Sequence, residues 1–315
     1  MEQDQLYLGI DGGGTRTVAW LGTRCGNELN IVGRGNAGCG NARVIGLEAV
    51  AKNVQYAISQ AFVDARVDQR QVEGLHLSLA GVGRPEEKRA MQAWAEAQLD
   101  SRRVTISSDV EVILAACEQP DGIQSRATIA LVAGTGSIVF GKSTEGKQAR
   151  CGGWGFLLGD QGSAFDISLQ LLRLACRTAD GLESEHKLLD AILDATGCAG
   201  ASELIGWTYD VAGTRERVAA FARLAFEPTL QCPAVQGIVE SCAKQLAEAV
   251  VATARQLLVK DFALAIAGGL ICNQPSYERI VLDCCQRMDY APRQAVRVTD
   301  PVLGSLRLAA GLSQL

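Results

Sequence analysis

The chain has little of what several common chemistries require. Among its 315 residues there are only two histidines, His76 and His186, and aromatic residues make up 5% of the sequence. Imidazole chemistry is therefore a poor candidate for the centre of a mechanism. No apolar stretch approaches the ~20 residues that a membrane-spanning helix needs. No dense run of Lys or Arg offers a groove for nucleic acid, and the net charge of −5 agrees with that exclusion.

Signals for export and for a bound metal cluster are also missing. The first five residues are polar and acidic and lead directly into an apolar stretch, which is not the pattern of a signal peptide. The eleven cysteines are odd in number and scattered, and they include no C-x-x-C pair. That distribution indicates reduced, buried thiols rather than a disulfide framework, a zinc site or an iron–sulfur site. We therefore expect a cytoplasmic protein with neither nucleic acid nor membrane as a partner.

Apolar residues and paired glycine-rich turns are what the chain does have. Hydrophobic residues make up 48% of the sequence, and the length suggests two domains. Two turns, at 11–15 and 133–137, combine glycine with threonine, and each stands between two apolar stretches. Glycine permits positive φ and lets backbone amides approach an anion. Because the turn occurs twice, the sequence predicts a duplicated domain with the phosphates of a nucleotide held between the copies.

The order of the predicted elements also indicates a duplication. The first part should contain strands at 6–11, 17–23, 29–34, 74–80 and 103–108, with helices at 44–64 and 85–99. The second part should contain a hairpin at 127–143, a strand at 148–151, helices over most of 163–259, a strand at 262–267, a helix at 275–288, a strand at 295–299 and a helix within 301–315. Three antiparallel-capable strands followed by alternating helices and strands, found twice, is the order of the actin-like ATPase fold.

We therefore predict an α/β chain of two ribonuclease-H-like (actin-like ATPase) domains with an active-site cleft between them. The small N-terminal domain should comprise residues 1–113 plus 302–315. The larger C-terminal domain should comprise 114–301 and be enlarged by helices.

Two familiar nucleotide-binding patterns occur and are set aside. Residues 136–143 satisfy the P-loop pattern, but Ile, Val and Phe fill the loop positions, and a turn follows where a helix is required. Residues 33–38 satisfy G-x-G-x-x-G. Their strand is the third of a meander, however, and no acidic residue follows near the twentieth position.

Asp11 and Thr15 are the first candidate site residues. A carboxylate at the end of a first strand, followed by glycines and a hydroxyl, suits a hydrated Mg²⁺ beside phosphate oxygens. Asp11 would hold the metal through water, and Thr15 with nearby amides would hold phosphate. The alternative is a glycine-rich hairpin that Asp11 caps. The second turn, around Thr135, also has glycines and a hydroxyl but no acidic residue. This composition is expected of a second turn that binds the phosphates from the opposite side.

Asp109 stands between a predicted strand and a helix expected at 110–118. An aspartate in that position is commonly the N-cap of the helix. In a two-domain arrangement the same strand end faces the cleft. The carboxylate could then accept a proton from a substrate hydroxyl as that hydroxyl attacks a γ-phosphoryl group.

The densest segment is 152–163, where glycines flank Trp154 and Asp160 precedes a helix. It predicts either a loop leading to an N-capped helix or a polyol pocket with an aromatic wall and an acceptor carboxylate. Asn41 could add an amide to that pocket or cap its own helix. The glycine pair at 268–269, which ends a buried strand before an expected loop, could let adenine or ribose lie on the backbone or could reflect close packing.

Taken in order, these motifs resemble a known family. They are the stretches at 10–17, 108–109, 134–137, 151–155, 159–163, 267–269 and 301–304. The set resembles the N-acetylglucosamine kinase branch of the BadF/BadG/BcrA/BcrD ATPase family, within the sugar kinase–Hsp70–actin superfamily. The resemblance spans nearly the whole chain.

The resemblance implies an ATP- and Mg²⁺-dependent kinase that phosphorylates an amino sugar such as N-acetylglucosamine or glucosamine, with the 6-hydroxyl as the expected acceptor. Asp109 would be the catalytic base. ATP would be held by Gly13, Gly14, Thr15, Thr135, Gly136, Gly268 and Gly269. The sugar would contact Asn41, Asp109, Gly153, Trp154, Gly155 and Asp160. The apolar helices of the second half also favour a homodimer.

Some features leave alternatives open. Ile138 follows Ser137 where the animal kinases resemble G-T-G-S-N, and Asn36 competes with Asn41 for the sugar amide. The family also contains ATP-dependent activators of 2-hydroxyacyl-CoA dehydratase or benzoyl-CoA reductase enzymes, which need cysteines from each subunit for a shared cluster. Here Cys151 is the only cysteine inside a family motif, and the kinases carry it too. A non-catalytic actin-like scaffold would have no evident use for the pocket at 152–163.

Overall fold

The computed structural model describes residues 5–82, 85–117, 125–210 and 214–312. It divides the chain into two compact units. Unit 1 comprises Met1–Gln124 and Val298–Leu315, and unit 2 comprises Ser125–Arg297. The last residue of the helix expected at 110–118, and the end of the segment 301–315, lie outside the described residues.

Unit 1 is built on a five-stranded sheet in the order β3-β2-β1-β4-β5. The first three strands form an antiparallel meander, and β4 and β5 continue the sheet parallel to β1. The strands are β1 (Leu6–Gly12), β2 (Thr17–Cys25), β3 (Glu28–Ala37), β4 (Gly74–Leu79) and β5 (Val104–Ser107). Because β1, β4 and β5 are parallel, their carboxyl ends meet at one edge of the sheet, where α/β proteins commonly place ligands.

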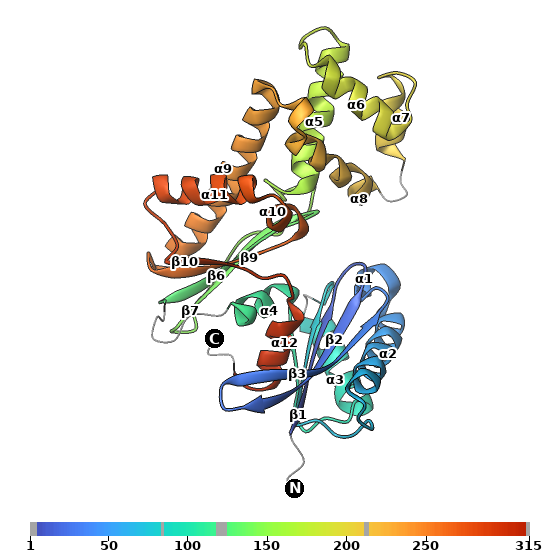
Figure 1. Ribbon diagram of the computed structural model, residues 1–315, viewed down its shortest axis with the longest axis vertical. Coiled ribbons are helices and arrows are strands. Elements are labelled where there is room, and N and C mark those ends of the chain that lie inside the picture. Colours follow the sequence, from blue (N-terminus) through green and yellow to red (C-terminus); the bar gives the residue numbers. More distant parts are fainter. Residues whose placement is uncertain (1–4, 83–84, 118–124, 211–213, 313–315) are drawn as a thin grey trace. The chain divides into compact units, whose positions relative to one another are not determined.

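Helices cover both faces of this sheet. They are α1 (Ala42–Ile45), α2 (Leu47–Ala65), α3 (Pro85–Gln98), α4 (Asp109–Ala116) and α12 (Val302–Ala309). Helix α2 packs on β2 and β3, while α12 packs on β1 and β4 at the opposite face, beside α4 (Figure 1). The approach of α2 needs glycine, because a Cβ added at Gly35 would lie 1.9 Å from the carbonyl oxygen of Ala57. The glycines of the stretch 33–38 therefore serve helix–strand packing rather than a dinucleotide.

Unit 2 repeats the same sheet topology. Its order is β10-β9-β6-β7-β8, so an antiparallel meander of β6, β7 and β8 is again extended by two parallel strands. The strands are β6 (Ala127–Ala133), β7 (Ser137–Ser143), β8 (Gln148–Gly152), β9 (Phe262–Ala267) and β10 (Gln294–Arg297). The predicted duplication and α/β class are confirmed. Residues 137–143 form strand β7, so the P-loop pattern is indeed a false match.

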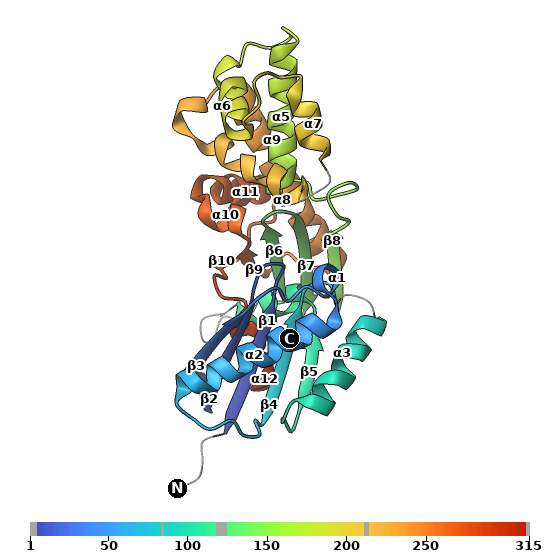
Figure 2. The ribbon, with the colours of Figure 1, turned by 90° about the vertical axis from the view of Figure 1, so that its right-hand side faces the viewer.

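The helices make unit 2 the more elaborate unit. They are α5 (Ala164–Ala179), α6 (His186–Thr196), α7 (Glu203–Tyr209), α8 (Thr214–Ala219), α9 (Pro233–Leu257), α10 (Gly269–Asn273) and α11 (Pro275–Arg287), with short 3-10 helices at Ala220–Phe226 and Pro228–Leu230. Helix α9 packs against β6, β7, β8 and α11. Figure 2 shows α6 and α7 at the end of this unit that is far from its sheet. None of the helices in the described ranges is both long and apolar enough to cross a lipid bilayer.

All eleven cysteines are free thiols, as expected, but most are not buried. Cys117, Cys242 and Cys285 are buried, whereas Cys25 and Cys176 are exposed and the remaining six are partly exposed. The expectation of buried thiols is therefore wrong for most of them, because many lie at strand ends and on the outer faces of helices.

Candidate functional site

The carboxyl edge of the unit 1 sheet carries three polar side chains. Asp11, near the end of β1, is opposite Ser78 of β4 in the parallel register. Asp109 follows β5 and is the first residue of α4. The Ser78 hydroxyl is fully buried and has no hydrogen-bond partner among the described residues. This edge therefore presents two carboxylates beside an unsatisfied hydroxyl, an arrangement that a water or a hydrated cation would complete.

The two carboxylates influence each other. Burial, and to a lesser extent the negative charge of Asp109, raise the pKa of Asp11 to about 6. The nearby Ser78 hydroxyl and the Arg16 guanidinium lower this pKa, but they do not offset burial. Desolvation by the surrounding protein also raises the pKa of Asp109, although the residue as a whole is exposed. A reachable carboxylate with a raised pKa is suited to accept a proton.

Local structure fixes the position of Asp109. The N-cap of α4 is Ser108, so the expectation that Asp109 itself could be the N-cap is wrong. The backbone amides of Asp109 and Val110, at the start of the helix, lower the pKa of the Asp109 carboxyl but do not outweigh desolvation. Ser108 Oγ donates to Glu111 Oε1 at 3.0 Å, and Lys88 Nζ lies 3.5 Å from the same oxygen. These contacts hold the first turn of α4 while leaving Asp109 accessible.

His76 connects β4 to β5 near the same edge of the sheet, and its imidazole is neutral at neutral pH. Its ring nitrogens lie 2.8 Å from Thr105 Oγ1 and 2.9 Å from Ser107 Oγ, joining β4 to β5. Burial lowers the pKa of His76 to about 4, with a smaller contribution from the charge of Lys88. The imidazole of His76 is thus a structural bridge between the two strands.

The first glycine turn leaves two backbone donors free. The Gly13 amide donates to the Arg16 carbonyl at 2.8 Å and closes the bend. No described residue accepts a hydrogen bond from the amides of Gly14 or Thr15, both of which are exposed. A Cβ added at Gly14 would meet no atom within 4 Å. Open space and two free amides are what a phosphate group needs, although Gly13 itself does not offer its amide.

The reason for glycine in these turns differs from the expected one. None of the glycines at 12–14, 134 or 136 has a positive φ. At Gly12 close contact requires glycine instead, because an added Cβ would lie 2.5 Å from a methyl group of Leu79. The same reasoning holds in unit 2, where an added Cβ at Gly136 would collide with the side chains of Arg215 and Asp160.

Asn41 is the N-cap of α1, as one alternative had it. Its Oδ1 accepts from the Arg43 amide at 3.0 Å and lies beside Gly81, just beyond β4. The preceding Gly40 donates to the Gly13 carbonyl at 2.8 Å, so this loop lies next to the first glycine turn. Asn36 instead lies exposed within β3. The structure therefore favours Asn41 over Asn36 as a neighbour of the Asp11 edge.

The second glycine turn, in unit 2, resembles the first in that one glycine amide closes the bend and the next two amides are free among the described residues. The Gly134 amide donates to the Gly136 carbonyl at 2.9 Å and closes the bend. Within the parts of the chain that are described, the amides of Thr135 and Gly136 have no acceptor. The start of α5 supports the turn from behind, because the Ala164 amide donates to the Gly134 carbonyl at 2.8 Å.

Asp160 is built into this second turn. Its backbone is left-handed, with φ of 61°, and it is 3% exposed. One carboxylate oxygen accepts from the Ser137 amide at 3.2 Å, and the other accepts from Arg215 Nη2 at 3.0 Å. Strained backbone of this kind often marks functional sites. Asp160 thus joins the turn, the loop before α5 and the start of α8.

Trp154 lies on an exposed loop of the same unit. It is 65% exposed, and the Arg150 guanidinium lies 4.7 Å from its ring centroid. Gly153 and Gly155 both have positive φ, so the backbone of this loop needs glycine at these positions. An open indole on a glycine-rich loop could form one wall of a sugar pocket, with one face already occupied by Arg150.

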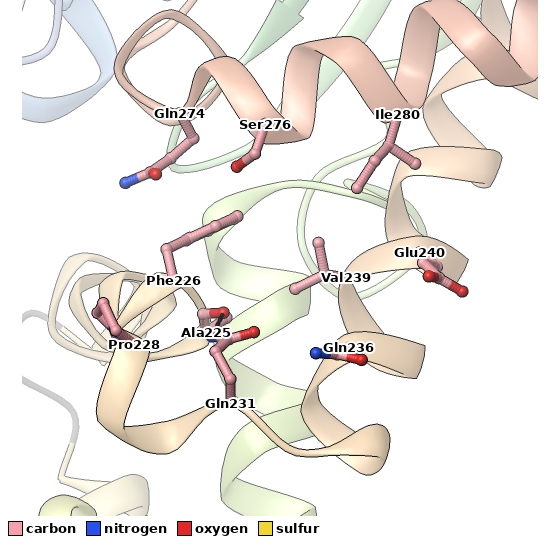
Figure 3. A pocket seen from close by; sticks show the side chains of 10 residues that line it. All are labelled: Ala225, Phe226, Pro228, Gln231, Gln236, Val239, Glu240, Gln274, Ser276 and Ile280. Carbon is pink, nitrogen blue, oxygen red and sulfur yellow. Dashed lines mark hydrogen bonds between the residues drawn. The ribbon is translucent and has the colours of Figure 1, made fainter.

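The two glycines at 268–269 have different roles. Gly268 has φ of 104°, and a Cβ there would lie 2.4 Å from the Ala133 carbonyl oxygen, so close packing explains it. Gly269 is open and begins α10, rather than the loop expected from the sequence. A cavity of about 360 Å³ lies where α10 ends, lined by Gln274 and by residues of the 3-10 helix Ala220–Phe226, α9 and α11. Figure 3 shows Val239 and Ile280 pointing into it, with Phe226, Gln236 and Gln274 around them.

Two residues of the candidate sites, Arg215 and Ser78, were not predicted from the sequence. Arg215 is 55 positions from Asp160 and has no local motif, so only the fold brings the two together. Ser78 lies in an apolar strand, and its role becomes visible only when β4 is paired with β1 in the observed register.

The residues fit a nucleotide with a divalent cation. The two pairs of free amides and the open backbone at Gly14 could hold phosphate oxygens. Asp11, beside the unsatisfied Ser78 hydroxyl, could hold a hydrated Mg²⁺. Across the described ranges, no three His, Cys, Asp or Glu side chains are grouped as ligands of one metal. Mg²⁺ needs no such group, because it commonly binds one or two carboxylates together with waters and substrate phosphates.

Two sheets of identical strand order, each with a glycine-threonine turn, define a two-domain protein of the actin-like ATPase fold. The sequence profile of the BadF/BadG/BcrA/BcrD ATPase family matches residues 8–294, and the chain belongs to that family. The family resemblance drawn from the motifs is thereby confirmed.

Individual relatives with similar sequences or structures are named as kinases of amino sugars. The chain is 28% identical over 272 residues to an N-acetylmuramic acid/N-acetylglucosamine kinase of Clostridium acetobutylicum, covering 85% of this chain and 86% of that protein. It is 29% identical over 233 residues to an N-acetyl-D-glucosamine kinase of Dictyostelium discoideum, covering 71% and 70%. A solved structure from Chromobacterium violaceum, described as a candidate N-acetylglucosamine kinase, has a TM-score of 0.72 at 21% identity and covers 97% of this chain and 99% of its own. This structural likeness confirms the fold.

Proposed function

We propose that this protein is an ATP-dependent kinase that phosphorylates a hydroxyl of an amino sugar, with the 6-hydroxyl as the expected acceptor. The observation that carries the proposal is the pair of coupled carboxylates at the carboxyl edge of unit 1. Asp109 is exposed with a raised pKa, and Asp11 stands beside an unsatisfied hydroxyl. Phosphoryl transfer requires a base for the attacking hydroxyl and a carboxylate for the metal, and this edge offers both.

In the proposed reaction Asp109 accepts the proton of the sugar hydroxyl. The hydroxyl oxygen forms a bond to the γ-phosphorus, the bond from that phosphorus to the bridging oxygen breaks, and its electron pair leaves with ADP. A bound Mg²⁺ would neutralise charge on the phosphates, and Asp11 would hold it through water. The free amides of Gly14, Thr15, Thr135 and Gly136 would hold phosphate oxygens.

The nucleotide base has a candidate pocket in unit 2. The cavity lined by Phe226, Val239, Ile280 and Gln274 begins where the short helix that follows Gly269 ends. Its apolar side chains suit a flat heterocycle, and its amides could recognise the ring nitrogens. We propose that adenine binds there, with ribose toward Gly269.

The sugar would be recognised by the loop at 153–155 and by Asn41, Asp109 and Asp160. Both oxygens of Asp160 already accept one hydrogen bond each, so a sugar hydroxyl would use a remaining lone pair. The preference for an amino sugar is supported by the names of the two curated relatives. We also propose that the protein is cytoplasmic and that it forms a homodimer. Light scattering of the purified protein would test the homodimer.

The experiment that tests the proposal is a coupled ADP-release assay over a panel of acceptors. The panel contains N-acetylglucosamine, glucosamine, glucose and no sugar, each with ATP and Mg²⁺. We expect ADP release that depends on an amino sugar and is lost in Asp109→Asn. Equal ADP release with and without sugar would overturn the proposal, as would a requirement for a redox partner in place of sugar.

A further inference from the structure

Arg215, the second residue of α8, covers the second glycine turn. A Cβ added at Gly136 would lie 2.3 Å from Arg215 Nη2, so the guanidinium rests directly on the backbone of the turn. The same Nη2 donates to Asp160 at 3.0 Å, and Asp160 in turn accepts from the Ser137 amide. A positive charge is therefore anchored over the turn whose amides at Thr135 and Gly136 have no acceptor in the described residues.

The guanidinium of Arg215 has further N–H groups besides the one that donates to Asp160. Its Nε is buried and lacks a partner among the described residues, whereas an arginine has five N–H groups to satisfy. The Phe156 ring lies 6.0 Å from Cζ and helps to orient the guanidinium plane. A buried donor without an acceptor is unfavourable unless a ligand supplies one. The group best matched to a guanidinium and two free amides is a phosphate.

We infer that Arg215 binds the transferred γ-phosphoryl group of ATP and stabilises the charge that it carries in the transition state. This inference rests on the proposed kinase function. Arg215 touches Gly136 of the phosphate turn and Asp160 of the proposed sugar site, so it lies between the two. The group that stands between the phosphates and the acceptor is the one being transferred. No bond to Arg215 forms or breaks, since it only donates hydrogen bonds to non-bridging oxygens.

A purely structural role for Arg215, as a clamp on Asp160, makes a different prediction. A clamp would affect every nucleotide alike, because its removal would loosen the whole turn. A γ-phosphoryl contact would affect only nucleotides that carry a third phosphate. The distinguishing quantity is therefore the ratio of affinities for a non-hydrolysable ATP analogue and for ADP.

Isothermal titration calorimetry of the full chain with AMPPNP and with ADP, both with Mg²⁺, measures this ratio. For Arg215→Ala we expect the AMPPNP affinity to fall by about 10-fold or more, and the ADP affinity to change by less than about 3-fold. The control is Arg217→Ala. That side chain lies on the same helix but pairs with Asp210 at 3.0 Å and stacks 4.4 Å from the Trp207 ring centroid. It should leave both affinities unchanged.

Turnover supplies a second readout. With the best sugar acceptor, Arg215→Ala should lower kcat by about 100-fold or more, and added guanidinium ion should restore part of the loss. If Arg215→Ala fails to fold, Arg215→Lys keeps a charge beside Asp160 and should still bind AMPPNP more weakly than the unaltered protein does, with ADP affinity preserved. Equal losses for AMPPNP and ADP, or no loss for either, would overturn the inference. A protein that binds both nucleotides but phosphorylates no sugar would overturn the proposed function and leave the binding test of Arg215 intact.

Discussion

Replacing Asp11 with asparagine should make the protein more stable at neutral pH while removing its phosphotransfer activity. Burial and the charge of Asp109 raise the pKa of Asp11 from 3.8 to about 6. The folded state therefore holds the Asp11 proton more tightly than the unfolded chain does. Since one pKa unit corresponds to about 1.4 kcal/mol, the ionised carboxylate costs unit 1 about 3 kcal/mol at pH 7. Asparagine keeps the shape and removes that cost.

The direction in which stability changes with pH makes the test specific to the Asp11 carboxyl. A raised folded-state pKa means that stability is lost as pH rises from about 4 to about 6 and then stays level. His76 acts in the opposite direction, because its folded-state pKa is lowered from 6.5 to about 4 and stability is lost as pH falls through that range. In the unaltered protein the two slopes nearly cancel. Asp11→Asn should remove the Asp11 slope and leave those of His76 and of Asp109, whose pKa is also raised.

Thermal unfolding of both proteins without nucleotide, from pH 4 to pH 7.5, is the assay. The difference in the free energy of unfolding should be only about 0.5 kcal/mol at pH 4 and grow to about 3 kcal/mol at pH 7, roughly 6–12 °C in Tm. Asp68→Asn, at an exposed position, is the matched control and should stay within about 0.5 kcal/mol at every pH. A stability difference that does not vary with pH, or a less stable Asp11→Asn at pH 7, would refute the reasoning.

Two further predictions test the base and the packing of unit 1. Asp109→Asn should fold and bind sugar normally but lose about 10²–10⁴-fold in kcat, because no group then accepts the hydroxyl proton; normal turnover would remove the assignment. Gly35→Ala should destabilise the protein by about 1–3 kcal/mol in urea unfolding, because the added methyl would lie 1.9 Å from the Ala57 carbonyl oxygen. Gly237→Ala, in α9 with no atom within 4 Å of the new Cβ, should instead stabilise it by about 0.5–1 kcal/mol, and the reverse order would contradict the packing argument.

The fold was largely predictable because its signals are local. Alternating or continuous apolar stretches mark the strands, and the strand predicted at 262–267 coincides with β9. The recurrence of a glycine turn after an apolar stretch revealed the duplication, and both sheets have the same strand order. Helix boundaries were less certain: Asp109 was weighed as an N-cap, yet Ser108 holds that position.

The candidate site was only partly predictable because its geometry is not local. The sequence indicated Asp11 and Asp109 as candidates, but their electrostatic coupling depends on β1 and β5 ending at the same edge of a sheet. Glycine in the turns was expected to provide positive φ, whereas at Gly12 and Gly136 close contacts with side chains distant in the sequence require it. The contact between Asp160 and Arg215 likewise depends on the packing of α8 against the loop before α5, and no motif records it.

The most direct test of the central claim is to identify the product of the reaction. Incubation with ATP, Mg²⁺ and N-acetylglucosamine or glucosamine, followed by mass spectrometry and ³¹P NMR, should give one sugar monophosphate for each ADP formed, with the phosphate on the 6-position. ADP accompanied by inorganic phosphate, with the sugar unchanged, would contradict the account.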